Sequence, residues 1–205
     1  MSCLAESWDR SWSSLGLRPP TGLCQQLWQA YSEPQRHYHS LQHLEECVAH
    51  FVAAKELATH AGEVEIALWF HDAIYEPDSK ENELRSAEWA KAALKAANAR
   101  PDMQQRVHAL ILSTRHDAAP SDPDQRLLVD IDLAILGATP ARFAEYGKQV
   151  RVEYGWVPED VYAVKRKAVL EGFLARQPLY NTSYFRGLCE AQARDNLAAA
   201  VAVLG

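Results

Sequence analysis

Residues 63–74 are the stretch that most constrains the fold, because they are apolar on nearly every face of a helix. A helix on a protein surface keeps one polar face, so a helix without one belongs in the middle of a domain. We therefore predict a central, buried helix here. It runs directly into His71 and Asp72, which places an imidazole and a carboxylate at the end of the buried segment.

The remaining segments repeat apolar residues at helical spacing, and alternating runs rich in β-branched residues are nearly absent. The sequence therefore predicts an all-α fold. A chain of 205 residues is long enough to bury its own core, so we expect one helical domain spanning 1–205. Gly137 is a candidate C-cap. Helices are expected near residues 3–15, 22–32, 39–59, 63–74, 80–98, 102–116, 124–137, 140–154, 159–176 and 182–204.

Charge and composition exclude several classes of function. The net charge is −6, whereas a surface that binds nucleic acids in general needs a basic footprint. No apolar run is long enough to span a membrane, and the N-terminus shows no signal-peptide pattern, so we expect a cytoplasmic protein. The cysteines form no close pair and are then expected as reduced thiols. They are Cys3, Cys24, Cys47 and Cys189.

Four side chains suited to metal binding come from three separate apolar segments. His43 follows His39 by four residues, which is one turn of the helix expected there. Asp132 lies inside a second strongly apolar helix, where a carboxylate without a partner is costly. Together with His71 and Asp72, His43 and Asp132 offer two imidazoles and two carboxylates, which suit a divalent ion. Buried residues satisfied by hydrogen bonds are the alternative, and spacing alone does not decide between the two.

The order His, His-Asp, Asp in an all-helical chain resembles the HD-domain superfamily of metal-dependent phosphohydrolases. The chain looks closest to the bacterial group of predicted metal-dependent HD phosphohydrolases, over roughly residues 25–200, with a short helical extension before them. The resemblance implies an HD-domain-like multi-helix bundle with a metal site between its central helices. The phrases that carry it are RHYHSLQH (36–43), ALWFHDAIY (67–75), DIDLAILG (130–137) and KRKAVLEGFLARQPLYNT (165–182).

The resemblance also implies a metal centre held by His43, His71, Asp72 and Asp132. Asp130 is the rival for the last position, because residues two apart on a helix point about 200° apart and cannot both face one ion. The implied cofactor is one or two divalent ions of Mn, Fe, Mg, Zn, Co or Ni.

Catalytic roles follow from the same resemblance. The phrase around His39 is similar to the Tyr-His-Asn-x-x-His phrase of cyclic-nucleotide phosphodiesterases, in which the first His protonates the leaving oxygen; here Ser40 replaces the Asn. His39 is then the general acid, Asp72 orients the attacking water, and His116 steadies negative charge. A His39 that only supports the ligands or caps the helix is the alternative.

Cationic side chains in or near these phrases are expected to bind the phosphate of a substrate. Ion pairs on the surface or between helices are the alternative for each of them. The four candidates are Arg36, Arg115, Lys165 and Arg166.

These implications describe a phosphohydrolase in which a metal-activated water attacks a nucleotide or other small phosphate ester. We expect no membrane partner and no general nucleic-acid binding. Trp8, Trp12 and Trp28 could pack in the core or form a homodimer contact. The alternative functions are a non-catalytic HD module that holds metal and nucleotide, a di-iron oxygenase of the HD type, and a purely structural helical protein.

Overall fold

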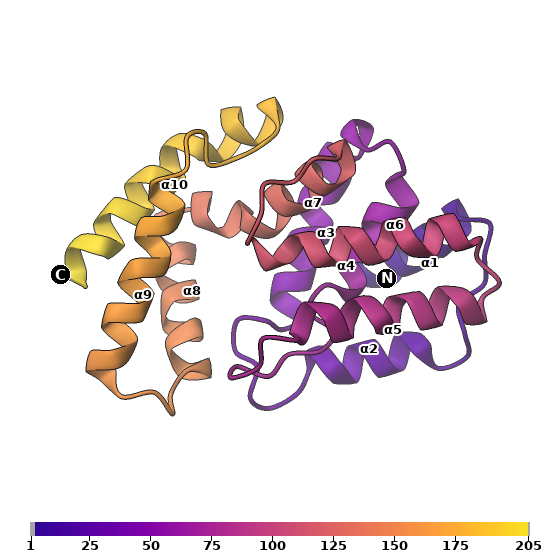
Figure 1. Cartoon of the computed structure of the whole chain (residues 1–205), viewed down its shortest axis with the longest axis horizontal. Helices are drawn as coiled ribbons and strands as arrows, with labels where there is room; N and C mark the ends of the chain where they lie inside the picture. The colour runs from indigo at the N-terminus through magenta and orange to yellow at the C-terminus, as the bar shows by residue number, and fades with distance from the viewer. Residues whose placement is uncertain (1–2, 205) are drawn as a thin grey trace. The chain divides into compact units, whose positions relative to one another are not determined.

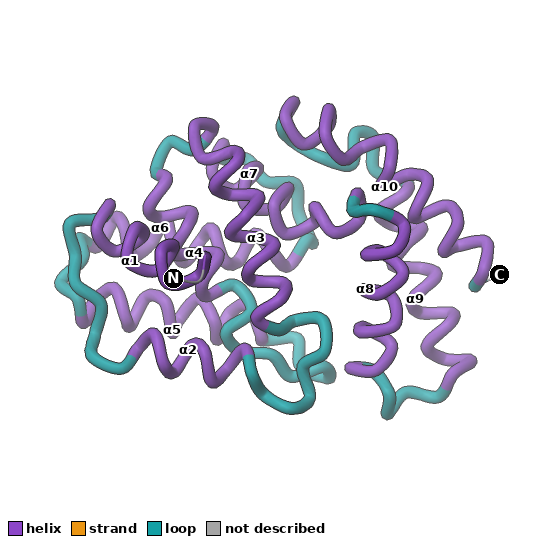
Figure 2. Tube along the Cα trace, turned by 180° about the vertical axis from the view of Figure 1, so that it is seen from behind, coloured by secondary structure: helices purple, strands orange, loops and turns teal. Residues whose placement is uncertain are grey.

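The computed structural model describes residues 3–204, and helices and loops make up its backbone (Figure 1, Figure 2). These residues form ten α-helices and three short 3-10 turns, with no strand, and 71% of them are helical when the 3-10 turns are included. The prediction of an all-α, multi-helix fold is confirmed. None of the described helices combines the length and the apolarity needed to cross a membrane.

The chain divides into two compact units, Met1–Ile131 (unit 1) and Asp132–Gly205 (unit 2). A single domain spanning the whole chain stays a prediction. The elements of unit 1 are α1 (Cys3–Ser14), α2 (Leu23–Tyr31), α3 (Leu41–Ala54), η1 (Lys55–Leu57), α4 (Ala61–Phe70), α5 (Asn82–Ala96), α6 (Pro101–Leu112), η2 (Ser113–Arg115) and α7 (Pro123–Asp132), whose last residue opens unit 2. Those of unit 2 are η3 (Leu133–Gly137), α8 (Pro140–Glu153), α9 (Glu159–Leu174) and α10 (Ser183–Val203).

Helix α4 is the centre of unit 1, as predicted. Nine of its ten residues are buried, and it packs against α1, α3, α5 and α6 (Figure 1). Two of the buried residues are acidic. Arg106 donates two hydrogen bonds to Glu63, and Glu65 accepts from Arg10 and Ser7. The central helix therefore tolerates two carboxylates because arginines from α6 and α1 neutralise them.

The N-terminal helix completes this core with tryptophans. Trp8 and Trp12 are both buried, and the Trp8 ring lies 5.0 Å from the ring of Trp69 in α4, measured between centroids. The indole N–H of Trp69 donates to Ser7 Oγ at 3.1 Å. Core packing thus explains Trp8 and Trp12, and a homodimer stays a prediction.

One buried carboxylate ties the start of α7 to the turn before α4. Asp124 accepts hydrogen bonds from the backbone N–H groups of Thr59, at 2.6 Å, and His60, at 2.9 Å. Its Oδ2 atom also lies 3.0 Å from His60 Nδ1. This connection fixes where α7 begins within unit 1, and the helix then carries the acidic residues of the DIDL phrase.

Unit 2 is built around the turn η3, which packs against α8 and α10. A Cβ atom on Gly137 would lie 2.6 Å from Cys189 Cβ, so only glycine allows this close approach. The prediction that Gly137 is a C-cap is wrong, because Gly137 is the last residue of η3 and Ala138 is the C-cap. Gly137 is also not among the glycines with positive φ. Asn196 of α10 donates to the carbonyl groups of Leu136 and Ala138, each at 2.9 Å, and so secures the end of η3.

A carboxylate of α10 binds the loop between α9 and α10. Glu190 accepts hydrogen bonds from the backbone N–H groups of Leu179, at 3.1 Å, and Tyr180, at 3.2 Å, and from Arg194 at 2.6 Å. Burial raises the pKa of Glu190, but these three donors outweigh it and hold that pKa below its usual value. The ionised form of Glu190 therefore stabilises the loop.

Candidate metal centre

Helix α3 carries two candidate ligands on its buried face. The helix begins at Leu41, so His43 lies in its first turn. Cys47 follows four residues later and shares the face of His43. Both residues are 2% exposed, and the Cys47 Sγ atom lies 3.7 Å from His43 Nε2.

His71 follows the last residue of α4 and meets His43. The Nδ1 atom of His71 lies 2.8 Å from the carbonyl oxygen of Leu68, so Nδ1 carries the proton and donates it. When His71 is neutral, as a metal ligand must be, its lone pair is therefore on Nε2, which lies 3.1 Å from Nε2 of His43. A ring N–H bonded to a backbone carbonyl is also how proteins orient histidines that bind metals.

Asp72 brings a carboxylate oxygen to the same point. Its Oδ2 atom lies 3.2 Å from His71 Nε2 and 3.4 Å from His43 Nε2. Burial raises the pKa of this carboxyl group. In the metal-free form, however, the charge of a protonated His71 and hydrogen bonds from His43 and His71 outweigh burial and hold the pKa well below its usual range. Asp72 is therefore an anion, and its side chain is 17% exposed.

The spacing of these three atoms fits one bound ion. With metal–ligand bonds of about 2.0–2.1 Å and angles of about 90–110°, two ligand atoms lie about 2.8–3.4 Å apart. The three observed separations are 3.1, 3.2 and 3.4 Å. Imidazole nitrogen and carboxylate oxygen together suit Zn, Mn, Fe and similar divalent ions. The residues present therefore fit a divalent ion between His43, His71 and Asp72.

A second grouping joins Cys47 and Asp132 to the two histidines and does not include Asp72. One ligand atom from each of four residues, the other two being His43 and His71, lies within 4.8 Å of the others. Asp132 is the last residue of α7, and the rest of that helix belongs to unit 1. The rival Asp130 is fully buried and is not a member of this group. The geometry therefore favours Asp132 over Asp130 as the ligand from α7.

Cys47 was predicted only as a reduced thiol, and its position beside the candidate ligands was not predicted. Cys24, Cys47 and Cys189 are thiols, as expected, and the side chain of Cys3 lies outside the described part of the chain. The sequence does contain a signal for Cys47, because four residues after His43 is one helical turn on the same face.

Arg36 holds the loop that carries Asp72. Its side chain is completely buried, and its guanidinium donates to the backbone carbonyl groups of His39, at 3.1 Å, Asp72, at 2.6 Å, and Ala73, at 2.9 Å. A fourth hydrogen bond, of 2.9 Å, reaches the carboxylate of Glu33. These contacts make Arg36 a positioning residue, and its binding of a substrate phosphate stays a prediction.

His39 lies before α3, so its predicted place in the first helical turn is wrong. Ser40 is the N-cap and has an extended backbone, which breaks the one-turn spacing between His39 and His43. The His39 ring instead stacks on the ring of Tyr75 with 4.0 Å between centroids. Its centroid still lies 6.1 Å from that of the His43 ring. His39 is thus half-buried beside the ligands, and its contact with Tyr75, not helical spacing, accounts for this position.

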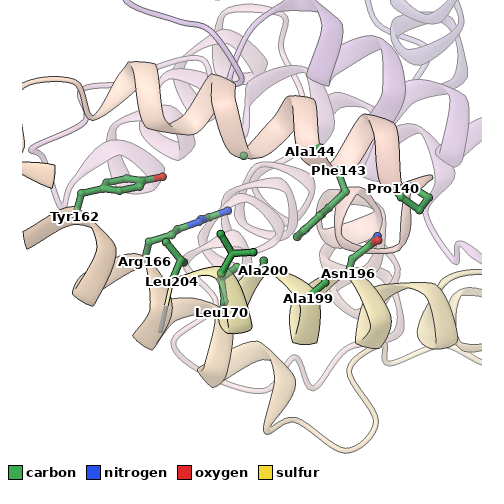
Figure 3. A pocket seen from close by; sticks show the side chains of 12 residues that line it. Pro140, Phe143, Ala144, Tyr162, Arg166, Leu170, Asn196, Ala199, Ala200 and Leu204 are labelled. Atoms are coloured by element: carbon green, nitrogen blue, oxygen red, sulfur yellow. The ribbon is translucent and has the colours of Figure 1, made fainter. Parts of the chain in front are cut away.

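The other predicted site residues are not in the ligand group. His116 is the C-cap of η2 and has a left-handed backbone, φ 57°. The Arg115 Nε atom lies 4.0 Å from a carboxylate oxygen of Glu83 in α5. In unit 2, Lys165 is exposed on α9. Arg166 reaches from α9 into a pocket of about 400 Å³ lined mostly by apolar residues of α8, α9 and α10 (Figure 3). Binding of phosphate by Arg115, Lys165 and Arg166, and the role of His116, stay predictions.

Compared with protein-family models, curated proteins and solved structures, the chain matches none. The resemblance to HD phosphohydrolases therefore rests on the sequence phrases and stays a prediction. The donor geometry around His43 and His71 is independent of any relative, because it follows from the distances between atoms of this chain.

Proposed function

We propose that this protein is a metal-dependent phosphohydrolase that acts on a nucleotide or another small phosphorylated metabolite. The observation that supports it most is the set of three donor atoms, on His43, His71 and Asp72, whose separations of 3.1–3.4 Å suit one ion. The HD resemblance supplies the reaction class. A bound divalent ion supplies Lewis acidity, which polarises a phosphoryl oxygen and brings the pKa of a bound water toward neutrality.

Two side chains of this chain are then available for the proton transfers. Asp72 is anionic and partly exposed, so its carboxylate can accept a hydrogen bond from the attacking water and orient it. His39 lies beside the ligands and can hold a proton for the leaving oxygen. Arg36 donates to the backbone carbonyl groups of both residues. It thereby fixes the distance between the backbone of the proton donor and that of the carboxylate that orients the water.

The test combines metal analysis with a panel of phosphate monoesters, diesters and pyrophosphates. Purified protein should retain a divalent ion, and one class in the panel should be hydrolysed only with that ion present. The variant His71→Ala should lose the ion. His39→Ala should keep it but lose about 10²–10⁴-fold in kcat. His108→Gln, which removes only a pairing with Glu88, is the control and should resemble the wild type. Metal-replete protein that is inactive across the panel would refute the proposal.

A second candidate function is a non-catalytic metal-binding module. It is favoured by one observation, the grouping of Cys47 and Asp132 with the two histidines. Four protein donors complete the tetrahedron of a structural zinc site and leave no position for water, whereas catalytic sites keep one position open. Stable metal binding without any turnover would favour this candidate.

A further inference from the structure

Cys47 is the one member of the four-residue ligand group that the HD resemblance does not account for. It is buried in unit 1, one turn after His43 on the same face of α3. The ordinary explanation of a buried cysteine is that its side chain packs like a small apolar residue. The Cys47 thiol, however, lies with the nitrogens of His43 and His71 and a carboxylate oxygen of Asp132, all within 4.8 Å.

The distance from Cys47 to His43 suits two ligands of one ion. A Zn–S bond of about 2.3 Å and a Zn–N bond of about 2.1 Å at a tetrahedral angle put sulfur and nitrogen about 3.6 Å apart. The observed distance from Cys47 Sγ to His43 Nε2 is 3.7 Å. The sulfur also lies 3.8 Å from His43 Nδ1, so it is beside the ring and not in line with the Nε2 lone pair. The two side chains are therefore close enough to share an ion after a rotation of the Cys47 or His43 side chain.

We propose that the Cys47 thiolate is a metal ligand, and that it makes this centre select thiophilic ions such as Zn²⁺, Co²⁺ or Fe²⁺ over Mg²⁺ and Mn²⁺. On binding, the S–H bond breaks, the proton passes to solvent and a sulfur–metal bond forms. Thiolate is a soft ligand, whereas Mg²⁺ and Mn²⁺ are best served by oxygen. The inference rests on the metal site of the proposed function, and it narrows the choice of ion.

The test is a titration of the metal-free, full-length protein with Co²⁺, followed by absorption spectroscopy. A thiolate ligand produces a sulfur-to-cobalt charge-transfer band in the near ultraviolet, which a site of nitrogen and oxygen donors lacks. The wild type should show this band, and Cys47→Ser should lose it. Cys24→Ser is the matched control, because Cys24 belongs to unit 1 but not to the ligand group; it should keep the band.

Competition titrations then measure selectivity. Cys47→Ser should weaken Zn²⁺ binding by roughly two orders of magnitude, the share of one ligand in a four-ligand zinc site. Its affinity for Mn²⁺ should change by less than about threefold, because oxygen suits that ion. The spectrum of the wild type needs no variant, so the proposal can be judged even if Cys47→Ser does not fold.

The outcomes separate this inference from the proposed function. Cobalt binding without the charge-transfer band overturns the role of Cys47 and leaves the metal centre intact. Absence of binding by any ion overturns both. The band together with hydrolysis of one class in the phosphate-ester panel supports both proposals. The band in a metal-replete protein that is inactive across the panel supports Cys47 and overturns the proposed function, because a four-coordinate ion by itself can still carry a water as its fourth ligand.

Discussion

Replacement of Arg36 by methionine tests the idea that this residue holds the candidate metal centre together. The buried guanidinium donates to three backbone carbonyl groups from two segments, residues 39 and 72–73, and to Glu33. Methionine fills similar space but leaves the three carbonyl groups without these donors. At about 1–1.5 kcal/mol for each lost partner, the free energy of unfolding should fall by about 3–5 kcal/mol.

Urea unfolding, followed by tryptophan fluorescence, measures this loss. For a chain of this size, 1 kcal/mol corresponds to about 2–4 °C in Tm, so thermal unfolding should shift down by roughly 6–20 °C. Arg100→Met is the control, because the Arg100 side chain is 80% exposed and pairs with Asp102 of α6. It should cost less than about 0.5 kcal/mol.

Metal affinity is a second measurement on the Arg36 variants, and it tests whether the loop that carries Asp72 supports the metal centre. When Asp72 loses its support from Arg36, the affinity for Zn²⁺ or Co²⁺ should fall by about 10–100-fold, as when partners that orient ligands are removed. Arg36→Lys should recover little, because an ammonium group cannot reproduce the planar fork of donors. A stable Arg36→Met protein with wild-type metal affinity would show that these four hydrogen bonds neither support the fold nor position Asp72.

Three further predictions concern unit 2. Glu190→Gln should cost about 1–2 kcal/mol at pH 7. Because the pKa of Glu190 is lowered in the folded state, its contribution is present above its unfolded value near 4.5 and is lost as the pH falls through the folded value. Urea midpoints measured from pH 7 to pH 3 should therefore converge for wild type and variant, and a constant gap would contradict this. Gly137→Ala should destabilise by about 1–3 kcal/mol, because its Cβ would meet Cys189; a neutral effect in thermal unfolding would mean that η3 can move. Ala200→Leu, at the apolar pocket, should add about 0.5–1 kcal/mol by filling space, and a lower Tm would show that this space is already occupied.

Helical periodicity was sufficient to predict the class of the fold and its central helix. The stretch before His71 is apolar on nearly every face, and a helix of this kind is stable only when other helices surround it. Helix ends are less well determined by periodicity. His39 continues the apparent spacing of α3, but the backbone is extended at Ser40, so the helix begins only at Leu41. A difference of two residues was enough to remove His39 from the helical face.

The remaining features of the site depend on contacts between residues far apart in sequence. Arg36 and Asp72 are 36 residues apart. No local sequence pattern distinguishes an arginine that donates to backbone carbonyl groups from one that binds the phosphate of a substrate. The choice between Asp130 and Asp132 is similar, because both lie on one apolar helix and only the position of that helix decides which carboxylate meets the histidines.

Cys47 is the opposite case. Its spacing from His43 was visible in the sequence. A thiol becomes a candidate ligand, however, only when a second imidazole from another helix lies beside it. Because α4 is apolar on nearly every face, its sequence does not predict toward which neighbouring helix His71 points. Ligand identity in this centre is therefore a property of helix packing, and a substitution that shifts α3 against α4 should change which ion is bound before it changes the fold.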